Sequence, residues 1–262
     1  MVRRWCILLA MLALTVGTAV SASSASAATS AGRFSPGGPI HLVGGSSSSH
    51  VRGISHQATS TNWSGYAATT GTYTSVSASW TQPSGTCRSG DQYASFWVGL
   101  DGYNSSSVEQ TGSEVDCVGR TAEYYAWYEM YPGPSENYPN TVRSGDHFNA
   151  SVTYKGSNKF SLYIADTTQG WSHTTTASLS GAARSSAEVI VEAPCCTAGG
   201  GILPLTNFGT ISLTGSLANG AALGSAGGVT GITMVDSSGR DKDTISSLSG
   251  GENFSATWVR SN

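Results

Sequence analysis

The sequence has no acidic residue before Asp91, although it carries 16 aspartates and glutamates among its 262 residues. From residue 62 onward these 16 acids stand against nine bases, which gives that region a formal net charge of −7. Binding to nucleic acid depends on Lys and Arg side chains that neutralise phosphates, so the composition argues against a nucleic-acid partner. A low charged fraction with an acidic excess instead suits a protein that works at low pH, where many carboxylates are neutral.

Long apolar runs are also scarce. The one at the N-terminus, from Cys6 to about Val16, follows two arginines and precedes a small-residue Ala-Ser-Ala sequence that ends at Ala27. This pattern is typical of a secretory signal cleaved after Ala27. The run is too short to span a bilayer, and no later segment approaches the length of a membrane helix. We therefore expect residues 1–27 to be a signal peptide and the product to be secreted, without a membrane partner once the signal is removed.

The next segment, residues 28–61, lacks acids and is rich in Gly and Ser, with two arginines and three histidines. Such a composition predicts a flexible leader or propeptide in front of a domain that spans residues 62–262. Its positive charge could dock on the acidic domain at neutral pH and detach when histidines and carboxylates take up protons. A passive linker explains the composition equally well.

Several familiar catalytic motifs are missing. The chain has no G-x-S-x-G elbow, no Walker or dinucleotide fingerprint and no HExxH sequence. Only His147 and His173 follow residue 62, and no CxxC spacing occurs, which argues against zinc. The stretch "DSSGRDKD", residues 236–243, lacks the spacing of a calcium loop and predicts a hairpin turn. We expect no metal and no cofactor.

Four cysteines follow the signal sequence, and they allow three disulfide pairings in an oxidising compartment. We prefer Cys87 with Cys117. A bond between the adjacent Cys195 and Cys196 remains open, although Cα atoms about 3.8 Å apart lie below the usual disulfide range.

From residue 62 onward the pattern is one of short strands and turns with almost no helix. The segments that alternate or run apolar are rich in Val, Ile, Thr and aromatic residues, and Gly, Ser, Asn and Asp separate them. They cover residues 73–80, 93–100, 122–132, 147–154, 159–166, 187–194, 208–215, 231–236 and 253–259. About 200 residues of this kind predict an all-β sandwich or barrel.

Two of these strands carry acids among apolar residues. In "AEVIVE", residues 187–192, alternation places Glu188 and Glu192 on one face. On this pattern alone, a charged strand edge that discourages aggregation is favoured over a catalytic carboxylate. In "AEYYAWYEMYP", residues 122–132, Glu129 shares a face with aromatic side chains, which fits either a cleft or a half-buried strand whose acid is hydrogen-bonded.

Three segments, in their order and spacing, resemble the glutamic peptidases, the eqolisin family of secreted acid endopeptidases. They are "FWVGLDGYNSSSVEQTG" at 96–112, "YAWYEMYP" at 125–132 and "AEVIVE" at 187–192. The resemblance begins at "NWSGYA", residues 62–67, and reaches Trp258. It implies a concanavalin A-like, jelly-roll type sandwich of two seven-stranded antiparallel sheets, with a Gln and Glu dyad on the concave face.

Carried over by position, the dyad falls on Gln110 and Glu192. The resemblance implies that Glu192 is the general base and acid acting on water and that Gln110 stabilises the oxyanion. Four residues beyond the glutamine this chain has Glu114 where the fungal enzymes have Asp, and Asp116 could also take that role. The resemblance also implies that Trp97, Asp101, Glu129 and Glu188 line or support the site. From their residue types, we expect Trp97, Trp127 and Tyr131 to form apolar walls that position the peptide.

The implied function is a secreted endopeptidase that acts at acid pH on proteins or peptides, with a monomer as the expected form. A sandwich of this kind also hosts carbohydrate chemistry. Glu192 paired with Glu188 or Glu129 could form the acid and nucleophile of a glycoside hydrolase. A carbohydrate-binding, lectin-like module without catalysis is a third reading. Gln110 discriminates between them, because a two-carboxylate glycosidase does not need it.

Overall fold

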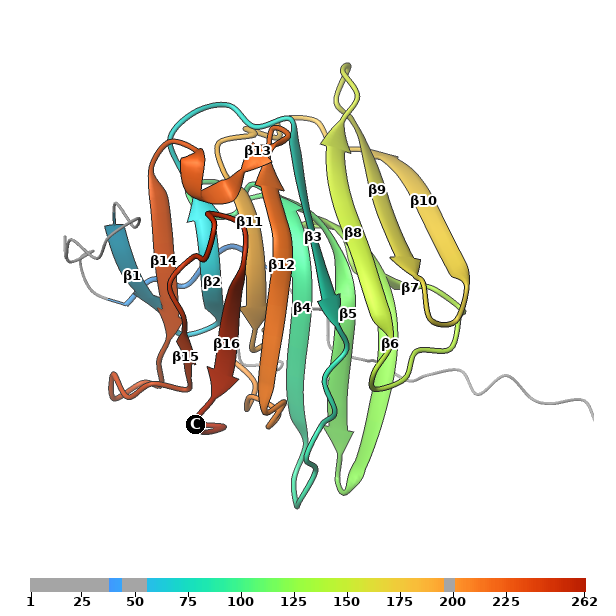
Figure 1. Ribbon diagram of the computed structural model, residues 1–262, viewed down its shortest axis with the longest axis vertical. Helices are drawn as coiled ribbons and strands as arrows, with labels where there is room; N and C mark the ends of the chain where they lie inside the picture. The colour runs from blue at the N-terminus through green and yellow to red at the C-terminus, as the bar shows by residue number, and fades with distance from the viewer. Residues whose placement is uncertain (1–37, 44–55, 196–200) are drawn as a thin grey trace, which may run out of the picture. The chain divides into compact units, whose positions relative to one another are not determined.

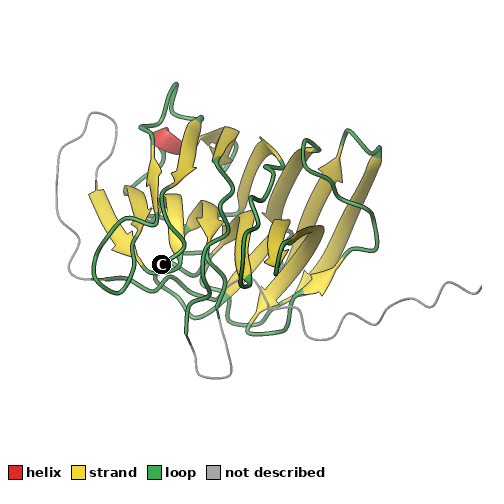
Figure 2. Ribbon diagram, turned by 90° about the horizontal axis from the view of Figure 1, so that it is seen from below, coloured by secondary structure: helices red, strands yellow, loops and turns green. Residues whose placement is uncertain are grey.

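The computed structural model describes residues 38–43, 56–195 and 201–262, and these form two packed β-sheets (Figure 1). Within that part of the chain the helical structure is one 3-10 turn, Leu223–Ser225, drawn in red in Figure 2. The predicted all-β sandwich is confirmed. The expected signal peptide and most of the expected leader lie outside the described residues. In the part of the chain that is described, no helix is long and apolar enough to cross a membrane.

Sheet 1 carries the strands with the predicted site residues. Its order is β1 (His56–Ser60), β14 (Val229–Met234), β2 (Trp63–Ala68), β11 (Ala187–Glu192), β4 (Gln92–Leu100), β5 (Val108–Val118), β6 (Thr121–Tyr131) and β7 (Glu136–Asn137). Neighbours pair antiparallel except β1 and β14, which are parallel. Residues 56–60, near the end of the expected leader, thus form a strand of the sheet.

Sheet 2 is antiparallel throughout. Its order is β10 (Trp171–Ser178), β9 (Lys159–Asp166), β8 (His147–Tyr154), β3 (Ser75–Thr81), β12 (Thr210–Ala218), β16 (Phe254–Trp258) and β15 (Asp243–Ile245), and β13 (Ala221–Ala222) pairs with β12. Each sheet therefore has eight strands rather than the seven that the resemblance implies. The difference is one two-residue strand per sheet, β7 and β13.

Strand alternation divides the apolar side chains into two clusters. Val189 and Val191 of β11 pack between the sheets, where Phe148 and Leu162 of sheet 2 meet them. Ile190, from the same strand, belongs to a separate cluster made of sheet 1 residues, on the opposite face of that sheet. The predicted two-sidedness of β11 is confirmed, and Glu188 and Glu192 lie on the outer face of sheet 1.

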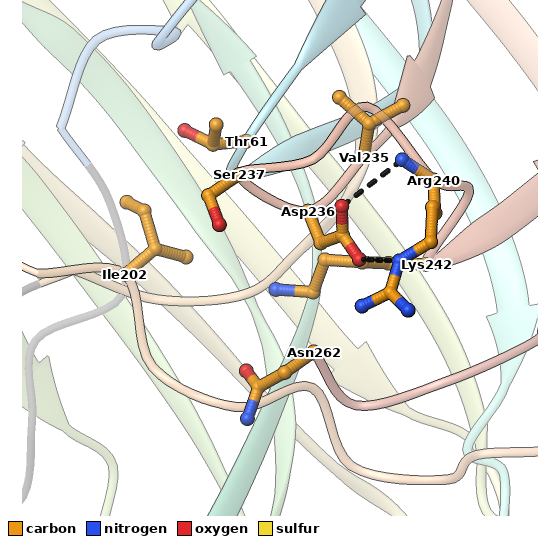
Figure 3. Close-up of a pocket in the computed structure, with 8 residues that line it drawn as sticks. All are labelled: Thr61, Ile202, Val235, Asp236, Ser237, Arg240, Lys242 and Asn262. Carbon is orange, nitrogen blue, oxygen red and sulfur yellow. Dashed lines mark hydrogen bonds and ion pairs between the residues drawn. The ribbon is translucent and has the colours of Figure 1, made fainter.

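The stretch predicted as a hairpin turn follows β14 and leads into β15 (Figure 3). Val235 and Asp241 form an antiparallel bridge that closes the loop. The carboxylate of Asp236 accepts hydrogen bonds from the backbone N–H groups of Ser238 and Arg240, at 2.8 and 3.0 Å, and from Arg240 Nε at 2.6 Å. The hairpin prediction is confirmed, and its turn is fixed around one acid.

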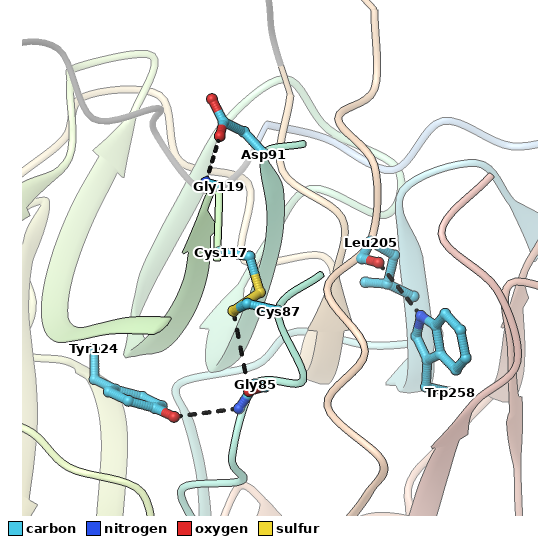
Figure 4. Close-up of a disulfide and its surroundings, with 8 residues drawn as sticks. All are labelled: Gly85, Cys87, Asp91, Cys117, Gly119, Tyr124, Leu205 and Trp258. Atoms are coloured by element: carbon cyan, nitrogen blue, oxygen red, sulfur yellow. Dashed lines mark hydrogen bonds between the residues drawn. A yellow bond between two sulfur atoms is a disulfide. The ribbon is translucent and has the colours of Figure 1, made fainter. Parts of the chain in front are cut away.

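The predicted Cys87–Cys117 disulfide is present and ties the segment before β4 to the end of β5 (Figure 4). Two hydrogen bonds hold the same region: Gly85 N to Tyr124 Oη at 3.2 Å and Gly119 N to Asp91 Oδ1 at 2.9 Å. Cys195 is also in a disulfide, whose partner lies outside the described residues. The long β4–β5 pair, which carries much of the predicted site, is therefore cross-linked at one end.

Candidate active site

Except for Asp101 and Tyr131, the predicted site residues lie on the outer face of sheet 1 in three rows that run across β11, β4, β5 and β6. The glutamine row is Glu188, Gly99, Gln110 and Glu129; the tryptophan row is Ile190, Trp97, Gly112 and Trp127; the glutamate row is Glu192, Ser95, Glu114 and Tyr125. Members of a row are direct cross-strand partners. The three rows are two residues apart along each strand, so all three lie on the same face of the sheet. Four strands that are far apart in the sequence thus bring the predicted dyad and its supports onto one surface.

Glu192 is fully buried in the glutamate row. Its Oε2 accepts a hydrogen bond from Trp97 Nε1 at 2.8 Å, and its Oε1 accepts one from Asn62 Nδ2 at 3.4 Å. Burial raises the pKa of Glu192 well above its usual range; the Trp97 hydrogen bond opposes this, and the charge of Glu129 adds to it. The pKa of Glu192 therefore depends on how completely the neighbouring side chains exclude water from its carboxyl group.

Gln110 is anchored by the residue directly opposite on β6. Its Nε2 donates to Glu129 Oε2 at 2.6 Å, and both residues are buried. The other amide atom, Oε1, has no hydrogen-bond partner within the described residues. A buried carbonyl oxygen without a partner costs about 1–3 kcal/mol, so Gln110 Oε1 is ready to accept a hydrogen bond from water or substrate. No direct hydrogen bond joins Gln110 to Glu192 in that part of the chain.

Two glycines allow the Trp97 side chain to lie between the dyad residues. A Cβ at Gly112 would lie 2.6 Å from Trp97 Cβ and 2.3 Å from a backbone oxygen of β4. A Cβ at Gly99 would lie 2.8 Å from the Trp97 ring and 3.2 Å from Gln110 Cβ. Real Cβ atoms do not approach this closely, so these positions require Gly because the Trp97 side chain lies across them.

Aromatic rings surround Glu192 and account for its burial. Trp63 meets Trp97 edge to face, with ring centroids 4.9 Å apart. Both rings are fully buried, and they share one apolar cluster with Trp127, Tyr125 and Ile190, packed together with Tyr131 at the end of β6. The predicted aromatic walls, Trp97, Trp127 and Tyr131, therefore come together around the glutamate and tryptophan rows.

Asp101 acts at the beginning of β11 and not beside the dyad. It has a positive φ of 71° directly after β4 and is fully buried. Its carboxylate accepts hydrogen bonds from the backbone N–H groups of Arg184, at 2.7 Å, and Ser185, at 2.8 Å. These bonds fix the turn that leads into the strand carrying Glu188 and Glu192. The predicted supporting role of Asp101 thus corresponds to positioning a strand.

Glu188 and Glu109 lie close to this turn and are both buried. Burial raises the pKa of Glu188 well above its usual range, and the charges of Asp101 and Glu109 add to the effect. Burial together with the charge of Asp101 raises the pKa of Glu109 to about 8. At acid pH Glu188 and Glu109 are therefore neutral, which reduces charge repulsion in this buried region.

The structure separates the two candidates for the acid beyond the glutamine. Glu114 lies in the glutamate row, with only Ser95 between it and Glu192, and it is fully buried. Burial first, and the charge of Asp116 second, raise its pKa well above the usual range. Asp116 lies one row further away and accepts a hydrogen bond from Tyr125 Oη at 2.9 Å. Glu114 is therefore the acid placed beside Glu192.

A short segment of the expected leader, Gly38–Val43, contacts the site; we call it the strap. Asn62 Nδ2 donates to Pro39 O at 3.4 Å as well as to Glu192, and His41 N donates to Asn62 Oδ1 at 2.8 Å. Ile40 packs against the apolar cluster around Trp97, and Gly38 lies against the Tyr131 ring. The strap and the predicted catalytic glutamate therefore share one amide side chain.

Sequence reasoning missed Asn62 and Trp63 as site residues. Both are fully buried, and they begin the "NWSGYA" segment that marked only the start of the resemblance. A polar residue followed by an aromatic one at the start of β2 was the available signal. Among the described residues, no group of three or more His, Cys, Asp or Glu side chains has an arrangement that could hold a metal ion.

Comparison with known proteins gives consistent matches. The Peptidase A4 family matches residues 61–258. Aspergillopepsin-2 from Aspergillus niger is 26% identical over 234 residues, which covers 80% of this chain and 81% of that protein.

Two solved structures share the fold. Scytalido-glutamic peptidase with a transition state analog inhibitor has a TM-score of 0.65 and 24% identity over 76% of this chain and 98% of that one. SCP-B, a member of the eqolisin family in a complex with the tripeptide Ala-Ile-His, has a TM-score of 0.63 at the same identity and coverage.

Proposed function

The chain belongs to the Peptidase A4 family, the glutamic endopeptidases also called eqolisins, and on that premise we propose that it cleaves proteins or peptides with Gln110 and Glu192 as its catalytic dyad. The assignment of the dyad rests on two buried groups that lie on the same face of sheet 1. One is a glutamate held by an indole N–H, and the other is an anchored glutamine with a free amide oxygen.

Glu192 does the proton work in this proposal. As a carboxylate it removes a proton from the attacking water, and as a carboxylic acid it returns a proton to the leaving nitrogen. Transfer of this kind typically contributes about 10² to 10⁴-fold. The hydrogen bond from Trp97 Nε1 favours the ionised form and therefore supports the base step, while burial among aromatic rings favours the acid form.

Gln110 stabilises charge and positions water, because an amide does not titrate in this range. Its NH₂ group has two N–H donors, one of which is used by Glu129. The second can donate to the oxyanion, while Oε1 accepts a hydrogen bond from the attacking water. Loss of one oxyanion donor costs about 10² to 10³-fold in other hydrolases. Glu129 is a positioning residue here, since it fixes which way the amide faces.

The scissile carbonyl lies over β4 in this arrangement. β4 runs between β5, which carries Gln110, and β11, which carries Glu192, and its outward residues Gly99 and Ser95 have little or no side chain. Small residues on both sides of Trp97 leave room for a peptide that both dyad side chains reach. Trp97, Trp127 and Tyr131 supply the apolar surface against which an extended peptide packs.

We also propose that the protein acts as a secreted monomer after residues 1–27 are removed, with residues 28–61 as its leader. The Cys87–Cys117 disulfide supports export, because such bonds persist in oxidising compartments. Family membership favours a peptidase over a glycoside hydrolase or a lectin-like module. The anchored Gln110 supports the same choice, since a two-carboxylate glycosidase has no use for it.

The test is digestion of an unfolded protein at about pH 3 to 5 by wild type, Glu192→Gln and Gln110→Ala. We expect cleavage to fall by at least about 10²-fold in both variants. Glu252→Gln, in a turn outside the site, is the matched control and should cleave like wild type. Equal cleavage by wild type and Glu192→Gln would exclude Glu192 as the base.

A further inference from the structure

A second concave site lies beside the predicted cleft, at the hairpin that follows β14 (Figure 3). It is a pocket of about 360 Å³, large enough for a small ligand group. Its lining residues are Thr61, Ile202, Val235, Asp236, Ser237, Arg240, Lys242 and Asn262. We call it the lysine pocket, and none of the residues assigned to the dyad or its supports lines it.

Lys242 is the unusual member of this pocket. It is only 3% exposed, and its amino group points into the hollow (Figure 3). Within the described residues its Nζ has no hydrogen-bond or ion-pair partner. An ammonium group that faces a pocket without a direct acid partner can pair with the negative charge of a ligand.

The neighbouring acids Asp243 and Asp236 act on Lys242 through their charge, but within the described residues neither forms a hydrogen bond or ion pair with its Nζ. Asp236 is already engaged by Arg240 Nε, at 2.6 Å, and by two backbone N–H groups of the hairpin. Asp243 accepts a hydrogen bond from Ser64 Oγ, and burial raises its pKa to about 7, so it is neutral at acid pH. Burial lowers the pKa of Lys242 to about 8, so the ammonium is charged throughout that range.

Further donors converge on the same space. The side chain of Arg240 is 60% exposed and uses only Nε for its bond to Asp236, which leaves its terminal N–H groups available. The hydroxyl groups of Thr61 and Ser237 also line the pocket. The pocket therefore brings together the Lys242 ammonium, the Arg240 guanidinium and several O–H donors, a pattern that recognises a carboxylate.

The pocket adjoins the cleft through consecutive residues. Thr61 lines it, and the next residue, Asn62, donates to Glu192 Oε1. Val235 N, on the other side of the pocket, donates to Ser60 O at 2.8 Å. Two consecutive residues of the chain, Thr61 and Asn62, therefore border the pocket and contact the predicted base, respectively.

We propose that the lysine pocket is a subsite for a peptide carboxylate, either the C-terminal carboxylate or an Asp or Glu side chain of a peptide bound in the cleft. This inference rests on the proposed function for the identity of the ligand as a peptide. The subsite predicts a preference for peptides that carry a negative charge on the side of the cleft next to Asn62.

Direct binding tests the proposal without requiring cleavage. We would titrate the Glu192→Gln protein at pH 5 with N-acetyl-Ala-Ala-Ala, with its C-terminal amide and with N-acetyl-Ala-Asp-Ala-amide, and measure affinity by calorimetry. One charge-assisted hydrogen bond typically gives about a tenfold difference, so we expect either the first or the third peptide to bind about tenfold tighter than the amide. Which of the two does so identifies the source of the carboxylate.

Lys242→Met should abolish this difference, Lys242→Arg should retain it, and Lys159→Met, on exposed β9, is the control. Equal binding of all three peptides, or an unchanged preference in Lys242→Met, would overturn the subsite. Inorganic phosphate that binds as tightly as the peptides would also overturn it, since the pocket would then select any small anion. If binding behaves as expected while wild type and Glu192→Gln cleave equally, only the proposed function fails.

A measurement on unmodified protein covers the case in which Lys242→Met does not fold. The pKa of the Lys242 amine, followed by NMR, starts near 8 and should rise when the preferred peptide binds, because a carboxylate favours the charged form. An unchanged pKa under saturating peptide would contradict contact between the two groups.

Discussion

Trp97 connects the aromatic wall of the site to the proton chemistry, because its indole N–H is bonded to Glu192 Oε2. This bond lowers the pKa of Glu192 against the larger effect of burial. Trp97→Phe keeps the ring surface and removes the donor. We expect the pKa of Glu192 to rise, and the acid limb of the pH–rate profile to move to higher pH because the base ionises later.

The measurement is kcat/KM for a short peptide between about pH 2 and 7. Trp80→Phe is the matched control, since Trp80 Nε1 donates to Ser113 Oγ in the core, away from Glu192. An acid limb at the same pH in Trp97→Phe and wild type would show that this bond does not govern the base.

Glu129 offers a second test at single-residue scale, because it anchors Gln110 directly. Glu129→Gln preserves the size of the side chain but replaces the carboxylate acceptor with a second amide. The Gln110 amide is then no longer held in one orientation. Since positioning is lost while substrate contacts remain, we expect kcat to fall about tenfold or more with little change in KM. Steady-state kinetics separates the two parameters, and a change confined to KM would contradict a positioning role.

At the scale of the strands, the sequence predicted those with clear alternation and missed those without it. β8 and β9 have the predicted bounds, and β11 has the predicted two faces. β5 was not predicted, although it carries Gln110. Its sequence "VEQTGSEVDCV" is mostly polar, yet all but its last residue are buried. Polar residues indicate exposure only when nothing covers them, and here tryptophan rings cover one face.

β11 corrects the interpretation that alternation alone favoured. The charged face predicted a strand edge, but β11 lies inside sheet 1 between β2 and β4. The dyad could be predicted only through the resemblance, because no spacing rule links Gln110 to Glu192, 82 residues further along the chain. Asn62 and the lysine pocket needed the folded chain, since their partners come from β11 and from the hairpin after β14.

The contact between β4 and β5 gives a prediction at this scale. Gly112→Ala places a methyl group against the Phe96 carbonyl and Trp97. Overpacking of this kind typically costs about 1–3 kcal/mol, so the free energy of unfolding should fall by that amount. Denaturant titration measures the free energy of unfolding. Ser212→Ala is the control, because Ser212 is an exposed residue of β12. A free energy of unfolding equal to that of wild type would mean that β4 and β5 move apart at no energetic cost.

For the molecule as a whole, the buried acids predict greatest stability in acid. Glu109 and Asp243 have pKa values raised to about 8 and about 7, and Glu114, Glu188 and Glu192 are also raised. A raised pKa stabilises the folded state below the unfolded value, near pH 4, and this contribution is lost as the pH rises through the folded value.

We therefore expect the melting temperature to fall by several degrees or more between pH 4 and pH 8. Glu109→Gln and Asp243→Asn should each flatten the fall, since each removes one titrating group. Thermal unfolding followed by circular dichroism checks this, and a melting temperature that rises over the same interval would contradict it.

The strap gives a second prediction for the whole chain. Among the described residues, its contacts with the site are hydrogen bonds of Pro39 and His41 with Asn62 and the packing of Ile40 against the aromatic cluster around Glu192. A chain that begins at residue 56 keeps β1 and lacks the strap. It should be more active at pH 4 to 5 than a chain that begins at residue 28, because Glu192 is less buried and ionises more readily.

β1 is held in sheet 1 by its pairing with β14, whereas the strap lies earlier in the expected leader, so a cut between the two would release only the strap. A cut anywhere between Val43 and His56 would leave β1 in its sheet and turn the strap into an independent peptide. A tethered segment competes at a fixed effective concentration, but a free one competes only at its actual concentration. After such a cut, inhibition by the released strap would weaken on dilution, so that activity would depend on the volume into which the protein is released.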